Sequence, residues 1–170
     1  MIFSSIKKLY FKCKTLKNTF KAKMKVSQYG YGLKVNYKST FTNNTIIGND
    51  CHFNGIDIVG NGKVIFGDHF HSGSNILIVT QNHNYHNPDF LPYDNIDILK
   101  NVIIGNCCWL GSRVIILPGT VIEEGVVVQA GSVLFGNIPK CAIVGGNPWK
   151  IIKYRDIDKY DQLVQENKYI

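Results

Sequence analysis

Apolar residues near the start of the chain recur at the spacing of an α-helix. They stand three or four positions apart, at Phe3, Ile6, Tyr10, Cys13, Leu16 and Phe20. No Gly or Pro interrupts residues 1–26, so the pattern predicts an amphipathic helix in an N-terminal segment, residues 1–27. Lysines fill the positions between the apolar residues, at Lys7, Lys8, Lys12, Lys14, Lys17 and Lys21. Two interpretations fit: a solvated helix docked on the body, or peripheral contact with an anionic membrane through residues 1–25.

Beyond Gly30 the apolar residues follow a period of six. Large aliphatic residues hold this spacing at Ile98, Ile104, Leu110, Ile116, Ile122, Val128 and Leu134. A small or medium-sized residue stands two positions earlier, at Cys108, Val114, Thr120, Val126 and Ser132. An upstream block repeats the rule with a one-residue slip, at Ile47, Phe53, Val59, Phe66, Ser72 and Ile78.

A six-residue unit with one large and one small inward side chain corresponds to a short strand and a turn. Such a strand buries nothing alone, but three units close a triangular coil of 18 residues, and successive coils stack through parallel ladders. The period therefore predicts an all-β solenoid over residues 28–145. Cys51 and Cys108 fall in its small inward positions, which gives both cysteines a packing role.

The regular count breaks between His83 and Ile98. A break in a solenoid projects a loop, which we place at residues 84–97, and loops on a rigid scaffold are where function concentrates. Residues 146–170 follow the last coil as a short C-terminal extension.

Composition and charge narrow the function classes. The chain of 170 residues fits one domain, and its net charge of +7 divides into +10 for residues 1–49 and −3 for the rest. A basic segment on a slightly acidic body, without aromatic interleaving, gives no support for nucleic-acid binding. Five cysteines without CxxC spacing indicate reduced thiols and a cytoplasmic protein, with the inner face of the membrane as a location if the helix binds lipid. We expect neither secretion nor a membrane span.

Several motifs, in this order, resemble the hexapeptide-repeat acetyltransferases. The motifs are Cys108 to Gly111, Ile116 to Gly119, Ala130 to Ser132, Ile138-Pro139 and Gly146 to Ile152. Within that superfamily the chain is most similar to the sugar O-acetyltransferases of the galactoside, maltose and capsule or O-antigen type. The resemblance implies a left-handed parallel β-helix, a homotrimer with active sites between neighbouring subunits, and acetyl-CoA as co-substrate.

The resemblance also implies roles for the residues around the loop. His83 matches the general base that takes the proton of the acceptor hydroxyl in a direct, ternary-complex transfer, and His86 is its main rival. Candidate acceptor-binding residues are Asn75, Tyr85, His86 and Tyr93. The neighbouring Phe90 offers another plane for a sugar ring, and Asp89, Asp94 and Asp97 offer acceptors for its hydroxyl groups.

Residues matching the family's CoA groove lie later in the chain. They are Trp109, Gly111, Ser112, Ala130, Lys150, Lys153 and Arg155, with the last three near the phosphates. The chain departs from the family pattern at Phe135-Gly136, where many relatives have Thr-Lys, and at Trp149, which replaces a small residue. We expect Trp149 to pack either on adenine or on the solenoid end.

These features predict an acetyl-CoA-dependent O-acetyltransferase that modifies a sugar hydroxyl in surface polysaccharide synthesis. One alternative is an N-acetyltransferase of a nucleotide-linked amino sugar. An alternative of another class is a metal-binding or non-catalytic β-solenoid, because His69 and His71 form an HxH pair and His52 falls one coil earlier. The spacing does not match a three-histidine zinc site, so we expect no metal.

Overall fold

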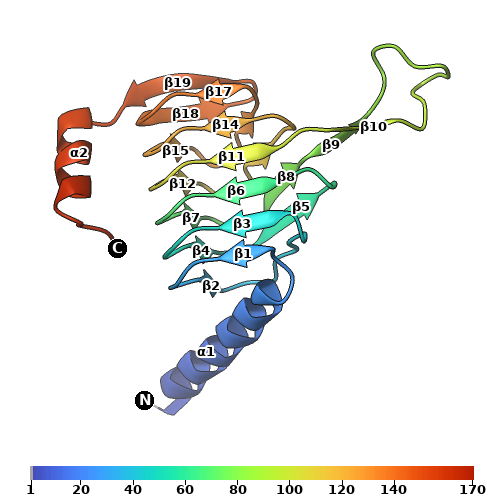
Figure 1. The fold of residues 1–170 in the computed structure, drawn as a ribbon. Helices are drawn as coiled ribbons and strands as arrows, with labels where there is room; N and C mark the ends of the chain where they lie inside the picture. The colour runs from blue at the N-terminus through green and yellow to red at the C-terminus, as the bar shows by residue number, and fades with distance from the viewer. Residues whose placement is uncertain (1) are drawn as a thin grey trace.

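The computed structural model describes residues 2–170, and side chains from Ser5 onward. Met1, the first residue of the predicted N-terminal segment, lies outside the described residues. Helix α1 (Ile2–Lys23) leads into a β-solenoid, which confirms the predicted fold class (Figure 1). None of the helices in residues 2–170 is both long enough and apolar enough to cross a membrane.

The solenoid has three faces of parallel strands. The first face runs in the order β1 (Gln28–Tyr29), β3 (Thr45–Ile47), β6 (Val64–Phe66), β11 (Val102–Ile104), β14 (Val121–Ile122) and β17 (Asn137–Ile138). The second face runs from β2 (Lys34–Val35) through β4 (His52–Phe53), β7 (His71–Ser72), β12 (Trp109–Leu110), β15 (Val127–Val128) and β18 (Ala142–Gly146). The third face contains β5 (Ile56–Val59), β8 (Ile76–Val79), β13 (Ile115–Ile116) and β16 (Val133–Leu134).

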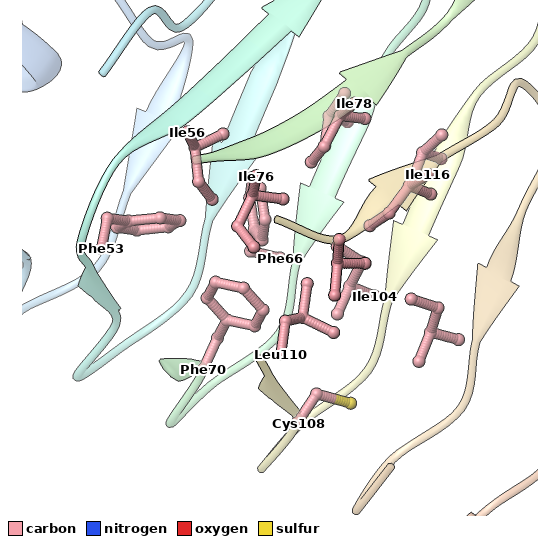
Figure 2. Close-up of a cluster of buried hydrophobic side chains, with 14 of the residues drawn as sticks. Phe53, Ile56, Phe66, Phe70, Ile76, Ile78, Ile104, Cys108, Leu110 and Ile116 are labelled. Carbon is pink, nitrogen blue, oxygen red and sulfur yellow. The ribbon is translucent and has the colours of Figure 1, made fainter. Parts of the chain in front are cut away.

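The core is a continuous stack of inward side chains. The period-six residues from Ile104 to Leu134 are all buried, and rings of Phe53, Phe66 and Phe70 pack with centroids 4.9–5.3 Å apart (Figure 2). Cys51 and Cys108 are buried as expected, and burial raises the pKa of both thiols to about 12, so neither is a reactive thiolate at neutral pH.

Two period-six assignments are wrong. Val59 is exposed, and its neighbour Ile58 points inward because β5 alternates with Ile56 and Ile58 inside. Ile98 lies outside the coils altogether, in an antiparallel hairpin. A period of six does not fix which of two adjacent apolar residues enters the core, since a one-residue shift turns the side chain to the other face.

The corners of the coil explain several unusual backbone angles. Where the first face meets the second, one residue of each turn adopts positive φ, namely Gly32, Asp50, His69, Cys107, Gly125 and Cys141. The corner between the second and third faces repeats this at Gly55, Asn75, Arg113 and Gly131. A left-handed residue is therefore a requirement of the turn, which Gly and Asn meet at least cost.

The hairpin leaves the corner where the third face meets the first, which we call the hairpin corner. Strands β9 (Gln81–His83) and β10 (Asp97–Leu99) pair antiparallel and carry the loop of residues 84–96. On the third face Ile115 pairs with Leu77, which precedes the hairpin in the chain, and with Val133, which follows Ile115 by the regular 18 residues. The hairpin is inserted without disturbing the ladder on either side (Figure 1).

The C-terminal segment folds back over the last coil. Strand β19 (Trp149–Tyr154) pairs antiparallel with β18, and helix α2 (Ile157–Gln165) follows. Asp156 caps α2 by accepting a hydrogen bond from the backbone N–H of Lys159 at 2.9 Å. Helix α2 and the hairpin project from opposite sides of the solenoid (Figure 1).

Candidate active site

His83 stands at the root of the hairpin, directly opposite Asp97. Its Nδ1 lies 3.4 Å from Asp97 Oδ1, and its ring stacks on Tyr93 with centroids 4.0 Å apart and planes 7° from parallel. Because one ring nitrogen faces the carboxylate, Nε2 is left for another partner. The side chains of His83 and Asp97 are each about half exposed, so the pair is open to a ligand.

Of the five histidines, all within the described chain, only His69 and His83 have a ring nitrogen within 4 Å of a carboxylate oxygen. His69 is covered by the ring of Tyr169, whose centroid lies 3.8 Å away, and its Nδ1 is buried. His83 is therefore the accessible histidine with an orienting carboxylate. Sequence reasoning assigned Asp97 to the acceptor. The structure instead places it beside the candidate base.

Asp94 organises the loop from inside. Its carboxylate accepts hydrogen bonds from the Ile96 backbone at 2.9 Å, the Asn84 side chain at 2.7 Å and the Asp89 backbone at 3.4 Å. The Ile96 bond is the largest cause of the lowered pKa of Asp94, and the Asn84 and Asp89 bonds add to it. Asp94 is buried, so the expectation that it contacts the acceptor is wrong.

A groove of about 410 Å³ lies at the hairpin corner. Tyr85 and His86 from the loop line it together with Asn82, Lys100 and Phe135. Phe135, which departs from the family pattern, therefore faces the same groove as the candidate acceptor-binding residues. Sequence reasoning missed this placement, although an outward aromatic residue at a coil corner was the available signal.

The second face carries a different group of candidates. Trp109 is exposed and lines a groove of about 350 Å³ with Arg155, Cys107 and His71. The guanidinium of Arg155 places a positive charge beside this groove, and its Nε is buried without a hydrogen-bond partner in the described chain.

Gly111, Ser112 and Ala130 gather at the corner between the second and third faces. A Cβ on Gly111 would lie 2.5 Å from the backbone N of Ala130, so only glycine allows the coils to stack this closely here. Ser112 Oγ accepts a hydrogen bond from the Ser74 backbone at 3.1 Å, and Asn75 follows in the same turn, in left-handed conformation. Asn75 thus shares a corner with the predicted CoA residues and lies away from the hairpin corner that carries His83.

Lys150 and Lys153 lie on the same side of β19 because of a bulge. A spacing of three residues in a regular strand would place them on opposite faces. The register shift leaves Ile152 without a ladder partner, so Lys150 pairs with Gly145 and Lys153 with Ile143. Trp149 donates its Nε1–H to the Phe135 carbonyl at 2.8 Å and packs against the core. Of the two expected positions for Trp149, on adenine or on the solenoid end, this contact favours the solenoid end.

The remaining histidines form a column on the second face. The rings of His52 and His71 lie 4.5 Å apart between adjacent strands. Burial is the main cause of the lowered pKa of both imidazoles, and neighbouring charges lower it further. Within residues 2–170 no three His, Cys, Asp or Glu side chains form a group suited to hold a metal ion.

Comparison with known proteins confirms the resemblance to hexapeptide-repeat acetyltransferases. Residues 101–136 match the family of bacterial transferase hexapeptide (six repeats). The chain is 54% identical over 52 residues to a putative lipopolysaccharide biosynthesis O-acetyl transferase, WbbJ, of Escherichia coli K12, covering 31% of this chain and 26% of that protein. It is 39% identical over 69 residues to a chloramphenicol acetyltransferase of Klebsiella aerogenes, covering 41% and 33%. The chain thus spans about a quarter to a third of these curated relatives.

Solved structures match over more of the fold. A maltose O-acetyltransferase from Clostridium difficile 630 superposes with a TM-score of 0.57 at 28% identity, covering 76% of this chain and 67% of that one. A galactoside acetyltransferase in complex with coenzyme A gives a TM-score of 0.66 at 26% identity, covering 78% and 68%. The fold and repeats therefore define a hexapeptide-repeat β-solenoid of the kind these acetyltransferases share.

Proposed function

We propose that this protein transfers an acetyl group from acetyl-CoA to a sugar hydroxyl, in the synthesis of a surface polysaccharide. The observation that carries the proposal is the pairing of His83 with Asp97 at the base of an exposed hairpin. The named activities of WbbJ and of the maltose and galactoside acetyltransferases support the acyl group and the sugar acceptor. The five free thiols fit a cytoplasmic reaction.

The hairpin residues suit general base catalysis. The Nε2 of His83 would accept the proton of the acceptor hydroxyl as its oxygen attacks the thioester carbonyl carbon. Asp97, beside Nδ1, would stabilise the imidazolium, and Tyr93 would hold the plane of the ring. The carbon–sulfur bond then breaks and the proton passes from His83 to the departing thiolate, so no covalent enzyme intermediate is needed.

The second face and the last coil have groups that fit a CoA molecule. Trp109 offers an exposed plane, and the close Gly111–Ala130 contact leaves that turn without a side chain at Gly111. Lys150 and Lys153 on one side of β19 would pair with phosphate oxygens, and the guanidinium of Arg155 adds a positive charge beside the Trp109 groove. Phe135-Gly136 stands where many relatives have Thr-Lys, so this position supplies no positive charge for the phosphates. We therefore assign phosphate binding to β19.

The division of these residues between corners supports a homotrimer. His83 lies at the hairpin corner, whereas Gly111 and Ser112 lie at the corner between the second and third faces. A site that uses both groups requires the hairpin of one copy and the second face of another. Co-expression of His83→Ala with Trp109→Ala tests this: mixed assemblies should regain activity that neither variant shows alone, and no recovery would contradict a shared site.

The activity is tested by thiol release from acetyl-CoA with a panel of sugars, oligosaccharides and nucleotide sugars. Each hydroxyl acceptor is paired with its amino analogue. We expect release with hydroxyl acceptors only. Release with amines only would assign N-acetylation instead, and absence of both release and CoA-dependent thermal stabilisation would overturn the enzyme proposal.

A further inference from the structure

Helix α1 docks on the solenoid mainly through polar side chains, together with the ring of Phe11, whose centroid lies 5.8 Å from that of Tyr37. Thr15 Oγ1 bonds Asn36 Oδ1 at 3.2 Å, and Thr19 Oγ1 accepts the Val35 backbone N–H at 2.9 Å. Asn18 donates to the Asn36 carbonyl at 3.2 Å, and Ala22 is buried one turn later. This contact holds α1 against β2 at one end of the solenoid (Figure 1).

The apolar side of α1 consequently faces away from the protein. We call it the outward stripe; it consists of Ile6, Leu9, Cys13, Leu16 and Phe20. At 3.6 residues per turn these positions lie opposite Thr15, Asn18 and Ala22. Leu16 is 62% and Phe20 65% exposed. An exposed apolar helix face of this size is typical of a binding surface for a partner other than the helix's own body.

Lysines border the outward stripe on both sides. Lys17 and Lys21 follow one edge and Lys12 and Lys23 the other, as in helices that lie in a membrane interface. A groove of about 540 Å³ along the flank of α1 is lined by Tyr10, by Cys13 of the stripe and by four lysines, Lys14, Lys17, Lys21 and Lys38. Residues 1–49 contain ten lysines and no acid, so no side chain of that segment neutralises this surface.

We infer that α1 binds an anionic phospholipid surface, with the outward stripe buried among the acyl chains and the lysines on the headgroup phosphates. The charge distinguishes this partner from a second copy of the helix. The stripe has the alternating three- and four-residue spacing of a coiled coil, but Lys12 and Lys17 occupy the flanking positions where pairing helices need opposite charges. Helices of several copies would bring these lysines together without an acid.

The test is flotation of the full-length protein with vesicles of phosphatidylcholine alone and of phosphatidylcholine with phosphatidylglycerol at 7:3. We expect binding to the anionic vesicles, weakening with added salt, and little binding to the neutral ones. Leu16→Asn should weaken binding at least about tenfold. The matched control is Leu91→Asn at the hairpin tip, 92% exposed, which should leave vesicle binding unchanged.

Charge is tested separately with Lys17→Gln/Lys21→Gln, which should lose about fivefold per lysine at low salt. Lys63→Gln/Lys159→Gln removes the same charge from the body and should have a much smaller effect. Equal binding to both vesicle types, or none, overturns the inference. The inference is also overturned if the protein binds no vesicles but forms an assembly that Leu16→Asn dissociates. Acetyl transfer to a soluble acceptor should be unchanged in Leu16→Asn, so this outcome is separate from that of the proposed activity.

Discussion

The coils and the β9–β10 hairpin keep their side chains in place by different means. In the coils each large apolar residue aligns with its equivalent in the next coil, as Ile104 does with Ile122, Leu110 with Val128 and Ile116 with Leu134. In the hairpin the apolar side chains of Phe90 and Leu91 stand in solvent, and one buried carboxylate, Asp94, organises the loop. The comparison teaches that the coils supply stability, whereas the hairpin supplies accessible polar groups at a fixed point on a rigid body.

The largest effect on stability should come from a cavity in the coils. Leu110→Ala removes a fully buried side chain and should lower the free energy of unfolding by about 2–5 kcal/mol. Leu91→Ala is the same change on the hairpin and should alter it by less than about 0.5 kcal/mol. Urea denaturation measures both, and similar losses would contradict the division of roles.

The next effect concerns catalysis alone. Asp97→Asn keeps the shape of the side chain but removes the charge beside His83, and kcat should fall roughly tenfold or more. The KM for acetyl-CoA should stay unchanged, and Asp97→Glu should restore part of the rate. Asp89→Asn is the control in the same loop. A raised KM with unchanged kcat would show that Asp97 serves substrate binding.

Loss of Asp94 should loosen the hairpin without unfolding the coils. Asp94→Ala removes three hydrogen bonds, so amide hydrogen exchange at Ile96 should quicken about tenfold while exchange in the coils stays slow. The lowered pKa of Asp94 also makes the ordering of the hairpin depend on pH. The stabilisation of the hairpin by the Asp94 carboxylate is complete above the ordinary pKa of 3.8 and is lost as the pH falls through the lowered value. Faster exchange throughout the coils would contradict a local role.

The smallest effect should come from the histidine column of the second face. The pKa of His52 and of His71 lies below the ordinary value of 6.5, so the unfolded chain binds protons more readily. Their contribution to stability is present above pH 6.5 and is lost as the pH falls through the lowered values. The melting temperature should therefore drop between pH 7.5 and 5.5, and the drop should be smaller in His52→Asn/His71→Asn. An equal drop in the melting temperature of the variant would show that these two imidazoles do not cause the pH dependence.

The repeat was predictable from the sequence because stacking demands the same residue type at each inward position, as from Ile104 to Leu134. The partners across the hairpin were not. The pairing of Asp97 with His83 depends on how two strands align across an intervening loop, and no local pattern encodes that register. The bulge that aligns Lys150 with Lys153 is hidden for the same reason.

The orientation of α1 shows the limit of periodicity in another way. The sequence revealed an apolar stripe and left open whether it faced the body or a membrane. The hydrogen bonds of Thr15, Asn18 and Thr19 to the first coil decide the orientation, and they join groups 16 to 21 residues apart. Polar groups that dock a helix carry no periodic signal.

The most direct test of the central claim is the rate of acetyl transfer by His83→Ala and His86→Ala, measured as thiol release from acetyl-CoA with the best acceptor of the panel. His83→Ala should lower kcat by about two to four orders of magnitude while the assembly and its melting temperature stay unchanged. His86→Ala, in the same loop, should retain most of the rate. Unchanged thiol release in His83→Ala, or the larger loss in His86→Ala, would contradict the assignment of His83 as the base.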